Sequence, residues 1–204
     1  MTAGLARTPQ PRRRDAARTR QTLLDAARKR FAQHGYSATT VREIADDAGV
    51  NVALINRYFE SKEGLFGACL TAAVDELRRT SDDVPFEQLP AVIARQVAGL
   101  TGEGRPSQVL LLLLRSSGDE RADRIRLGVL RGYGENLAAA AGWRPGDPDG
   151  AAMILRAQVV LAATTGIALL RSAGLEPLAS AGADDLAGPL RELLDALLTA
   201  RRTG

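Results

Sequence analysis

The sequence predicts an all-α protein, and three observations carry that prediction. The 204 residues are 45% hydrophobic and 25% charged, so the chain can bury a core without disulfides or a structural metal. Apolar residues recur at three-, four- and seven-residue intervals along most of the chain, whereas no stretch of useful length alternates as a strand does. Capping residues, glycines and prolines divide this pattern into separate helices. The length allows one or two domains.

Positive charge gathers at the front of the chain. The whole chain carries a net charge of only +3, but residues 1–66 hold 12 Lys+Arg against 7 Asp+Glu, and the remainder is mildly acidic. Residues 1–14 combine arginines, prolines and small residues without a periodic apolar face. We expect a disordered basic arm there, which either contacts an acidic partner or is a solvated tail.

The first predicted helix starts at Asp15 and stops before Gly35, because glycine accepts the left-handed backbone that ends helices. Its apolar residues form one amphipathic stripe, which predicts a buried face. The stripe comprises Leu23, Leu24, Ala27 and Phe31.

Two shorter helices follow, separated by a tight turn at Gly49. Thr40 and Glu43 match a capping box, in which the hydroxyl and the carboxylate each accept a hydrogen bond from an otherwise unpaired backbone N–H. Asn51 can cap the next helix, which runs to about Phe59. The front of the chain therefore holds three short helices, the last two joined by a glycine turn.

The rest of the chain continues as helices. Ser61 can cap a helix over residues 65–80, and prolines and glycines separate the later ones. These later helices are expected over residues 86–100, 106–114, 119–141, 149–171 and 184–202.

The two helices around Gly49 satisfy the packing demands of a helix-turn-helix, whose second helix enters the major groove of DNA. Ala45 is small enough for close approach, and apolar residues at helical spacing can form the buried side: Ile44, Ala48, Val50, Ile55 and Tyr58. On the opposite face, asparagine can bind adenine, arginine can bind guanine, and small apolar side chains can meet thymine methyls. That face comprises Asn51, Val52, Ala53, Asn56 and Arg57. An ordinary helical hairpin is the alternative, but the caps, the spacing and the basic arm together favour DNA binding.

Residues 21–66 resemble the DNA-binding domain of TetR-type (tetracycline-repressor-like) transcriptional regulators. The resemblance rests on the segments FAQHGY at 31–36, ATTVREIA at 38–45, AGVN at 48–51 and YFESKEGLF at 58–66. Many family members carry serine or threonine at the position of Asn51, and tyrosine at the position of Asn56. The resemblance therefore does not imply a base preference.

The resemblance also implies contacts outside the recognition face. Thr40 and Arg42 would touch phosphate or a base edge, and Tyr58 and Lys62 would hold the DNA backbone. Tyr58 can serve as a core residue as well, because a tyrosine can bury its ring and expose its hydroxyl.

The same resemblance implies a division of the chain. Residues 1–14 would be the arm, residues 15–62 a three-helix DNA-binding domain, and residues 63–204 a larger helical domain that binds an effector and dimerises.

By pattern alone, the apolar stripes of the last two helices are either core or a dimer surface, and the resemblance favours an interface of two helices from each subunit. The residues expected there are Leu155, Val159, Leu190, Leu194 and Leu197. The resemblance further implies an effector cavity among the middle helices. Candidate lining residues, each also suited to plain packing, are Phe86, Leu110, Leu113, Trp143 and Met153.

Composition argues against other classes of protein. A single cysteine, Cys69, cannot form an internal disulfide, and a single histidine, His34, cannot form a Cys/His zinc cluster. The chain contains no phosphate loop, Ser/His/Asp arrangement or paired-carboxylate signature, so we expect no enzyme, no metal and no cofactor. The apolar runs 109–114 and 159–170 are shorter than the roughly 20 residues that span a bilayer. We therefore expect a soluble cytoplasmic protein with no membrane contact.

Taken with the patterns, the resemblance implies a repressor that binds a palindromic operator in double-stranded DNA as a homodimer and is released by a small hydrophobic effector. A ligand-independent regulator, an activator, and a helical scaffold that makes only protein contacts are the alternatives. Specific DNA binding would separate the scaffold from the regulators.

Overall fold

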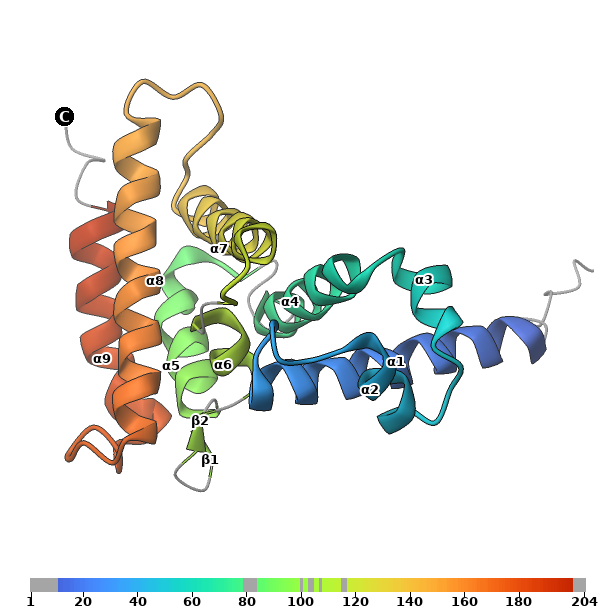
Figure 1. Cartoon of the computed structure of the whole chain (residues 1–204). Helices are drawn as coiled ribbons and strands as arrows, with labels where there is room; N and C mark the ends of the chain where they lie inside the picture. Colours follow the sequence, from blue (N-terminus) through green and yellow to red (C-terminus); the bar gives the residue numbers. More distant parts are fainter. Residues whose placement is uncertain are drawn as a thin grey trace, which may run out of the picture.

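The computed structural model describes residues 11–78, 84–99, 101–102, 105–106, 108–114 and 117–199. Within these ranges the chain is helical apart from turns and one antiparallel pair of two-residue strands, which confirms the predicted fold class (Figure 1). Most of the predicted arm lies outside the described residues, but Pro11–Arg14 already belong to the first helix. Proline suits the first helical position because its fixed φ matches the helix and its missing N–H would be unpaired there.

Four helices form the front half of the molecule. Gly35 and Gly49 have positive φ values of 84° and 64°, which confirms both predicted glycine stops. Ser61 accepts a hydrogen bond from the backbone N–H of Gly64 at 3.1 Å, which confirms it as the cap of the fourth helix. The helices are α1 (Pro11–His34), α2 (Val41–Asp47), α3 (Ala53–Phe59) and α4 (Lys62–Arg78).

The remaining elements form a helical body. It opens with the 3-10 turn η1 (Phe86–Gln88) and α5 (Leu89–Gly99), followed by the strand pair β1 (Thr101–Gly102) and β2 (Arg105–Pro106). The helices that follow are α6 (Gln108–Leu114), α7 (Glu120–Ala140), α8 (Gly150–Ser172) and α9 (Ala183–Leu194), and a π-helical turn, η2 (Asp195–Thr199), ends the described chain.

Two hydrophobic clusters make up the core. The first lies among α1–α4 and also takes in Leu112 and Leu113 of α6 and Ala122 of α7. The second joins α5, α7, α8 and α9. In Figure 1, α5, α8 and α9 stand side by side at one end of the molecule, while α1, α2 and α3 extend away from them. The first cluster thus connects the front half to the body through continuous packing.

Candidate functional site

The helix-turn-helix is built on a fully buried side. Ile44 of α2 and Ile55 of α3 are both 0% exposed, and Ala45 lies between the helices at 1% exposure. The predicted partners Ala48, Val50 and Tyr58 are partly buried against the same cluster. These contacts fix the two short helices, neither of which would be stable in isolation, against α1 and α4.

The opposite face of α3 is exposed to solvent. Asn51, Val52, Ala53, Asn56 and Arg57, the five residues predicted to meet base edges, are all exposed. Asn51 also binds the start of its own helix, because its Oδ1 accepts a hydrogen bond from the backbone N–H of Ala53 at 2.8 Å. This hydrogen bond uses one of the two lone pairs of Oδ1 and holds the Asn51 side chain at the start of α3, whereas a bidentate contact with adenine needs the oxygen and the –NH2 to be placed together against the base. Asn56 makes no such bond to its own helix among the described contacts, so it is the better candidate for adenine.

Side chains on neighbouring elements flank this face. Thr40 caps α2, donating its hydroxyl to Glu43 Oε2 at 2.8 Å and accepting the Glu43 N–H at 3.3 Å, which confirms the capping box. Arg42, in the first turn of α2, is exposed. The Arg57 guanidinium lies 5.9 Å from the ring centroid of Tyr58, which is partly buried. Tyr58 thus packs against the core while remaining beside the exposed face.

Lys62 rests on an aromatic ring whose role the sequence did not indicate. Its Nζ lies 4.2 Å from the ring centroid of Tyr36, which packs against Phe31 and Phe66 at centroid distances of 5.8 and 4.9 Å. Burial lowers the pKa of Lys62, although nearby carboxylates, led by Glu63, oppose this shift. Burial, with a smaller effect of Glu63, raises the pKa of Tyr36 to about 12. Tyr36 therefore stays neutral and positions the ammonium through a cation–π contact.

Arg30 joins α1 to α2. Its Nε lies 2.6 Å from Asp47 Oδ2, and its Nη1 lies 3.1 Å from Glu43 Oε1. The hydrogen bond from Arg30 lowers the pKa of Asp47. The pKa of Glu43 is lowered first by its hydrogen bonds from Thr40 and then by Arg30. Both carboxylates are thus held ionised at the end of the domain where α2 meets α1.

We expect Arg30→Met to reduce the acid sensitivity of folding. A carboxylate whose pKa is lower in the folded than in the unfolded chain stabilises the fold above its unfolded pKa, and this contribution is lost as the pH falls through the folded value. The free energy of unfolding, measured with urea, should therefore fall more between about pH 6 and about pH 3 for the wild type than for the variant. Two parallel pH profiles would contradict a role for the Arg30–Asp47 pair.

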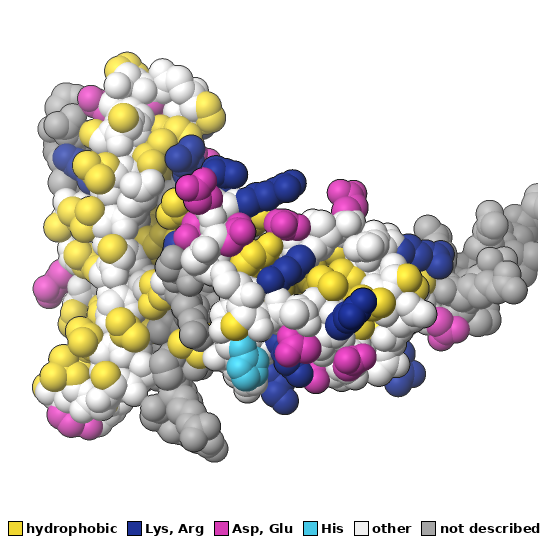
Figure 2. Space-filling view, viewed as in Figure 1, with side chains coloured by type: hydrophobic (Ala, Val, Ile, Leu, Met, Phe, Trp, Pro, Cys, Tyr) yellow, Lys and Arg dark blue, Asp and Glu magenta, His cyan; other side chains and the backbone are white. Residues whose placement is uncertain are grey.

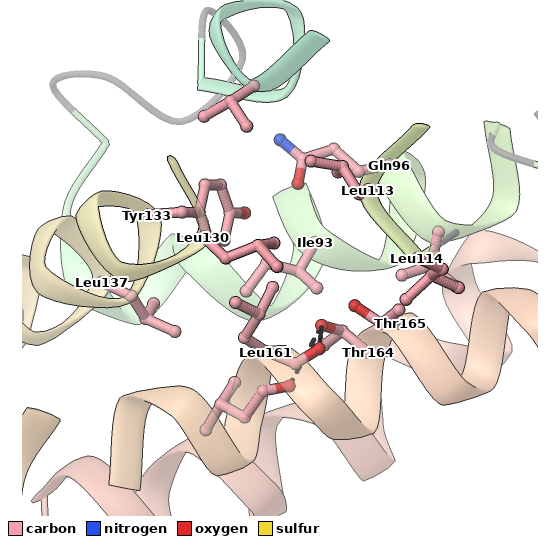
Figure 3. Close-up of a pocket in the computed structure, with 13 residues that line it drawn as sticks. Ile93, Gln96, Leu113, Leu114, Leu130, Tyr133, Leu137, Leu161, Thr164 and Thr165 are labelled. Carbon is pink, nitrogen blue, oxygen red and sulfur yellow. Dashed lines mark hydrogen bonds between the residues drawn. The ribbon is translucent and has the colours of Figure 1, made fainter. Parts of the chain in front are cut away.

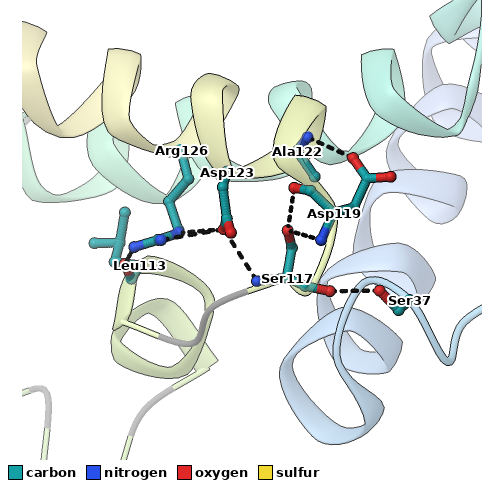
Figure 4. Close-up of polar contacts among 7 residues, drawn as sticks. All are labelled: Ser37, Leu113, Ser117, Asp119, Ala122, Asp123 and Arg126. Carbon is teal, nitrogen blue, oxygen red and sulfur yellow. Dashed lines mark hydrogen bonds and ion pairs between the residues drawn. The ribbon is translucent and has the colours of Figure 1, made fainter.

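A polar network links the front half to the body (Figure 4). The hydroxyl of Ser37, just after α1, donates to the carbonyl oxygen of Ser117 in the turn before α7. The Ser117 N–H donates to Asp123 Oδ1 at 3.0 Å, and Arg126 binds the same carboxylate. Arg126 also donates to the carbonyl oxygen of Leu113 at 3.2 Å. The network therefore ties the α1–α2 turn to both α6 and α7.

The body contains a cavity with about 700 Å³ of space outside atoms, part of it open to solvent (Figure 3). Five helices contribute to its lining, including Val74 of α4, Ile93 of α5, Leu113 of α6, Leu137 of α7 and Leu161 of α8. The polar side chains on its wall are Gln96, Tyr133, Thr164 and Thr165. The position of this cavity among the middle helices agrees with the sequence-based expectation, but its lining mostly does not.

Of the predicted lining residues, only Leu113 is placed at this cavity. The side chain of Leu110 lies outside the described residues. Phe86, Trp143 and Met153 pack instead against the second core cluster, because they sit in η1, in the α7–α8 loop and near the start of α8. The polar residues that do line the cavity were missed. A polar side chain within an otherwise apolar helix could have indicated them. Gln96 in α5 and Thr164 and Thr165 in α8 are such residues.

The last two helices carry an uncovered apolar face. Leu155 and Val159 of α8 are 61% and 45% exposed, and Leu169 and Leu170 of the same helix are also exposed. Figure 2 shows hydrophobic side chains along the length of this end of the molecule, whereas charged side chains gather elsewhere. Both α8 residues predicted at a dimer surface are therefore accessible.

The α9 residues require a correction. Leu190 and Leu194 are 1% and 0% exposed and pack within the protomer, so they cannot form an interface. Together with Leu186 and Leu198 they recur every four residues and face the second core cluster. Leu197 lies beside this buried row and is only partly buried. The wide stripe of α9 thus has a core side, which periodicity alone did not separate from its outer side.

The length argument against a membrane span also fails for α8. The apolar run 159–170 is short, but the whole helix has 23 residues and is long and apolar enough to cross a bilayer. Only 17% of its most apolar window is buried within the protomer.

Comparisons with known proteins agree with the helix-turn-helix and the helical body. Residues 23–69 match the family described as bacterial regulatory proteins, tetR family. A probable acrEF/envCD operon repressor of Escherichia coli K12 is 48% identical over 52 residues, which cover 26% of this chain and 24% of the repressor. The transcriptional regulator BetI of Agrobacterium fabrum is 30% identical over 151 residues, covering 70% of this chain and 72% of BetI.

Solved structures extend the likeness to nearly the whole length. A regulator from Pseudomonas aeruginosa PAO1 superposes with a TM-score of 0.65 over 94% of this chain and 93% of its own, at 22% identity, which shows a shared fold. The BetI match shows more than the fold, since it combines 30% identity with coverage of more than two thirds of both chains. This chain belongs to the TetR family of bacterial regulatory proteins.

Proposed function

We propose that this protein is a DNA-binding transcriptional regulator, acting as a repressor, that binds a palindromic operator as a homodimer. The observation that carries the proposal is the two-sided character of α3. Ile55 anchors one side of the helix with no exposed surface, while Asn56 and Arg57 project from the other. A recognition helix needs this combination of a rigid seat and a free polar face.

Dimerisation would use the uncovered face of α8, extended by the outer side of α9. A single recognition helix reads only a few base pairs, and two of them must lie about 34–36 Å apart to enter successive major grooves. Leu155 and Val159 supply apolar surface suited to the centre of such an interface. A second copy of the chain is a better partner for this face than lipid, because α8 belongs to a helical body whose core it shares.

A ligand in the body would control DNA binding through α4. This helix begins with Lys62 beside the recognition helix and carries Val74 to the wall of the cavity. A ligand that fits better when α4 is displaced would favour a state with misplaced recognition helices, and DNA would dissociate because the two states bind it differently. Residues 15–62 would be the DNA-binding domain, preceded by the arm at residues 1–14, and residues 63–204 would be the effector-binding and dimerisation domain.

Selection from a pool of random DNA duplexes tests the proposal and requires no assumed operator sequence. The full-length protein should enrich an inverted repeat whose half-sites lie about one helical turn apart, or a multiple of it. Fluorescence anisotropy on the enriched duplex should then show one dimer per repeat. Failure to enrich any sequence would overturn the regulator assignment and favour a scaffold.

Replacing Asn56 or Arg57 by alanine is expected to weaken binding to the enriched duplex by about 1–3 kcal/mol and to relax base preference at one position of each half-site. Base contacts carry specificity, whereas phosphate contacts do not. Competition with single-base variants of the duplex measures this. Asn136→Ala and Arg131→Ala, exposed positions on α7, are matched controls and should change neither quantity. Unaltered base discrimination in both test variants would contradict the recognition face.

A further inference from the structure

The polar groups on the cavity wall carry no formal charge at neutral pH. Among the described lining residues, Gln96, Tyr133, Thr164 and Thr165 are polar, and the others are hydrocarbon. Figure 3 shows these four side chains on α5, α7 and α8, bordering the same space as Ile93 and Leu161. An ion entering this space would lose hydration that only an opposite charge or a full set of hydrogen bonds replaces. The lining therefore selects against ions of either sign.

Arg126, a cation next to the wall, is already engaged by a carboxylate. Arg126 donates to the carbonyl oxygen of Leu113, a lining residue, at 3.2 Å. Its other two nitrogens lie 3.1 and 3.3 Å from Asp123 Oδ1, and its side chain is only 14% exposed. A ligand carboxylate would compete for this guanidinium with Asp123, whose charge already balances it, and Asp123 also accepts the Ser117 N–H of the network in Figure 4.

The uncharged polar groups suit a ligand oxygen. Thr164 donates its hydroxyl proton to the carbonyl oxygens of Val160 and Leu161, both at 3.0 Å, so its oxygen offers only lone pairs to the cavity. Gln96 and Tyr133 each already make a contact within the protein, but an amide has two donors and an acceptor oxygen and a phenolic hydroxyl both donates and accepts, so each group has more than one hydrogen-bonding position. A ligand hydroxyl, which also donates and accepts, matches this set, whereas an ammonium lacks acceptors and a carboxylate lacks donors.

We propose that the cavity binds uncharged, mostly hydrocarbon molecules that carry a hydroxyl group, and rejects their carboxylate and ammonium counterparts. This inference rests on the effector role proposed above and narrows that role to one chemical class. Gln96, Tyr133 and Thr165 are the specificity-determining residues.

Three ten-carbon compounds that differ only in their head group test this. The full-length protein is loaded with Nile red, an uncharged fluorescent dye, and titrated near pH 7.5 with 1-decanol, decanoate or decylammonium below their micelle concentrations. 1-Decanol should displace the dye with a dissociation constant at least ~10-fold lower than either ion, because the ions lose hydration without gaining a partner. The same titrations are repeated by anisotropy with the selected operator duplex, where 1-decanol should weaken DNA binding.

Substitutions in the cavity wall test whether these residues determine the preference for 1-decanol. Thr165→Val keeps the side-chain shape but removes the hydroxyl, and should weaken 1-decanol binding several-fold while leaving Nile red affinity unchanged. Gln96→Lys adds a cation to the wall and should shift the preference toward decanoate. Thr71→Val, at an exposed threonine of α4 outside the cavity, is the matched control and should change nothing.

The outcomes separate this inference from the effector role. Equal or tighter binding of decanoate or decylammonium by the wild type overturns the neutral-ligand class, and the effector role stands if those compounds alter operator affinity. Selective 1-decanol binding without any change in operator affinity supports the ligand class and contradicts the effector role. If neither Nile red nor any of the three compounds binds, both are wrong.

Discussion

Replacing Leu155 and Val159 together by glutamate is expected to yield a monomer that binds the selected operator at least ~100-fold more weakly than the wild type. Both side chains lie on the face of α8 that the protomer leaves uncovered, at 61% and 45% exposure. In a two-fold dimer the same face of the second copy would cover them, and carboxylates buried there would lose hydration without gaining a partner. The monomer would keep one recognition helix and lose the joint binding of two half-sites.

Sedimentation velocity and anisotropy on the palindrome measure the two effects. Because the substituted side chains are exposed in the protomer, the variant should keep the wild-type far-UV circular dichroism. Leu127→Glu is the control and should remain dimeric. Leu127 is 54% exposed, but it belongs to α7, outside the proposed interface of α8 and α9. A dimeric double variant with normal DNA affinity would place the interface elsewhere. Recovery of the wild-type protein with lipid vesicles would instead assign α8 to the bilayer.

Gly64→Ala is expected to destabilise the protein by about 3 kcal/mol and to abolish specific DNA binding. A Cβ at this position would lie 2.0 Å from the backbone oxygen of Phe59, the last residue of α3. No rotamer relieves this overlap, because both atoms are fixed by the backbone. The turn also contains Glu60, whose φ of 69° is unusual for a residue with a side chain. The alanine would therefore push α3 away from α4 and tilt the recognition face.

Gly128→Ala provides the matched control for this substitution. Gly128 lies inside α7, and an added Cβ would meet nothing within 4 Å. Alanine at an open helical position should leave stability unchanged or raise it by up to about 1 kcal/mol. Urea unfolding of both variants and anisotropy on the operator give the comparison. A Gly64→Ala protein as stable as the wild type would show that the α3–α4 turn adjusts freely.

The front half, α1–α4, was largely predictable because local rules decide it. The capping box of Thr40 and Glu43, the stop at Gly49 and the buried side of Ile44 and Ile55 are each set by neighbours within a few turns. The start of α1 at Pro11 was missed because charged, proline-containing sequence carries no apolar period. The contact of Asn51 with the start of α3 agrees with the prediction that this residue caps the helix, which local sequence also decides.

The body was less predictable because its faces depend on which helices meet. The α9 stripe is wide enough to serve a core and a surface at once, and only contact with α5 assigns Leu190 and Leu194 to the core. The cavity draws on five helices, so no single segment shows it, and Trp143 lies outside it because the α7–α8 loop places it against other residues. The contact between Ser37 and Ser117 joins residues 80 positions apart, beyond any local rule.

The first hydrophobic cluster bears on how members of this family can be recombined. Leu112, Leu113 and Ala122 of the body complete the same cluster that holds α1–α4. A chimaera that joins residues 1–62 to the body of another regulator would inherit foreign side chains at these three positions and a foreign partner for Ser37. Residues 1–62 therefore do not form an independent folding unit. A chimaera that uses them has to retain α6 and the first turn of α7 as well.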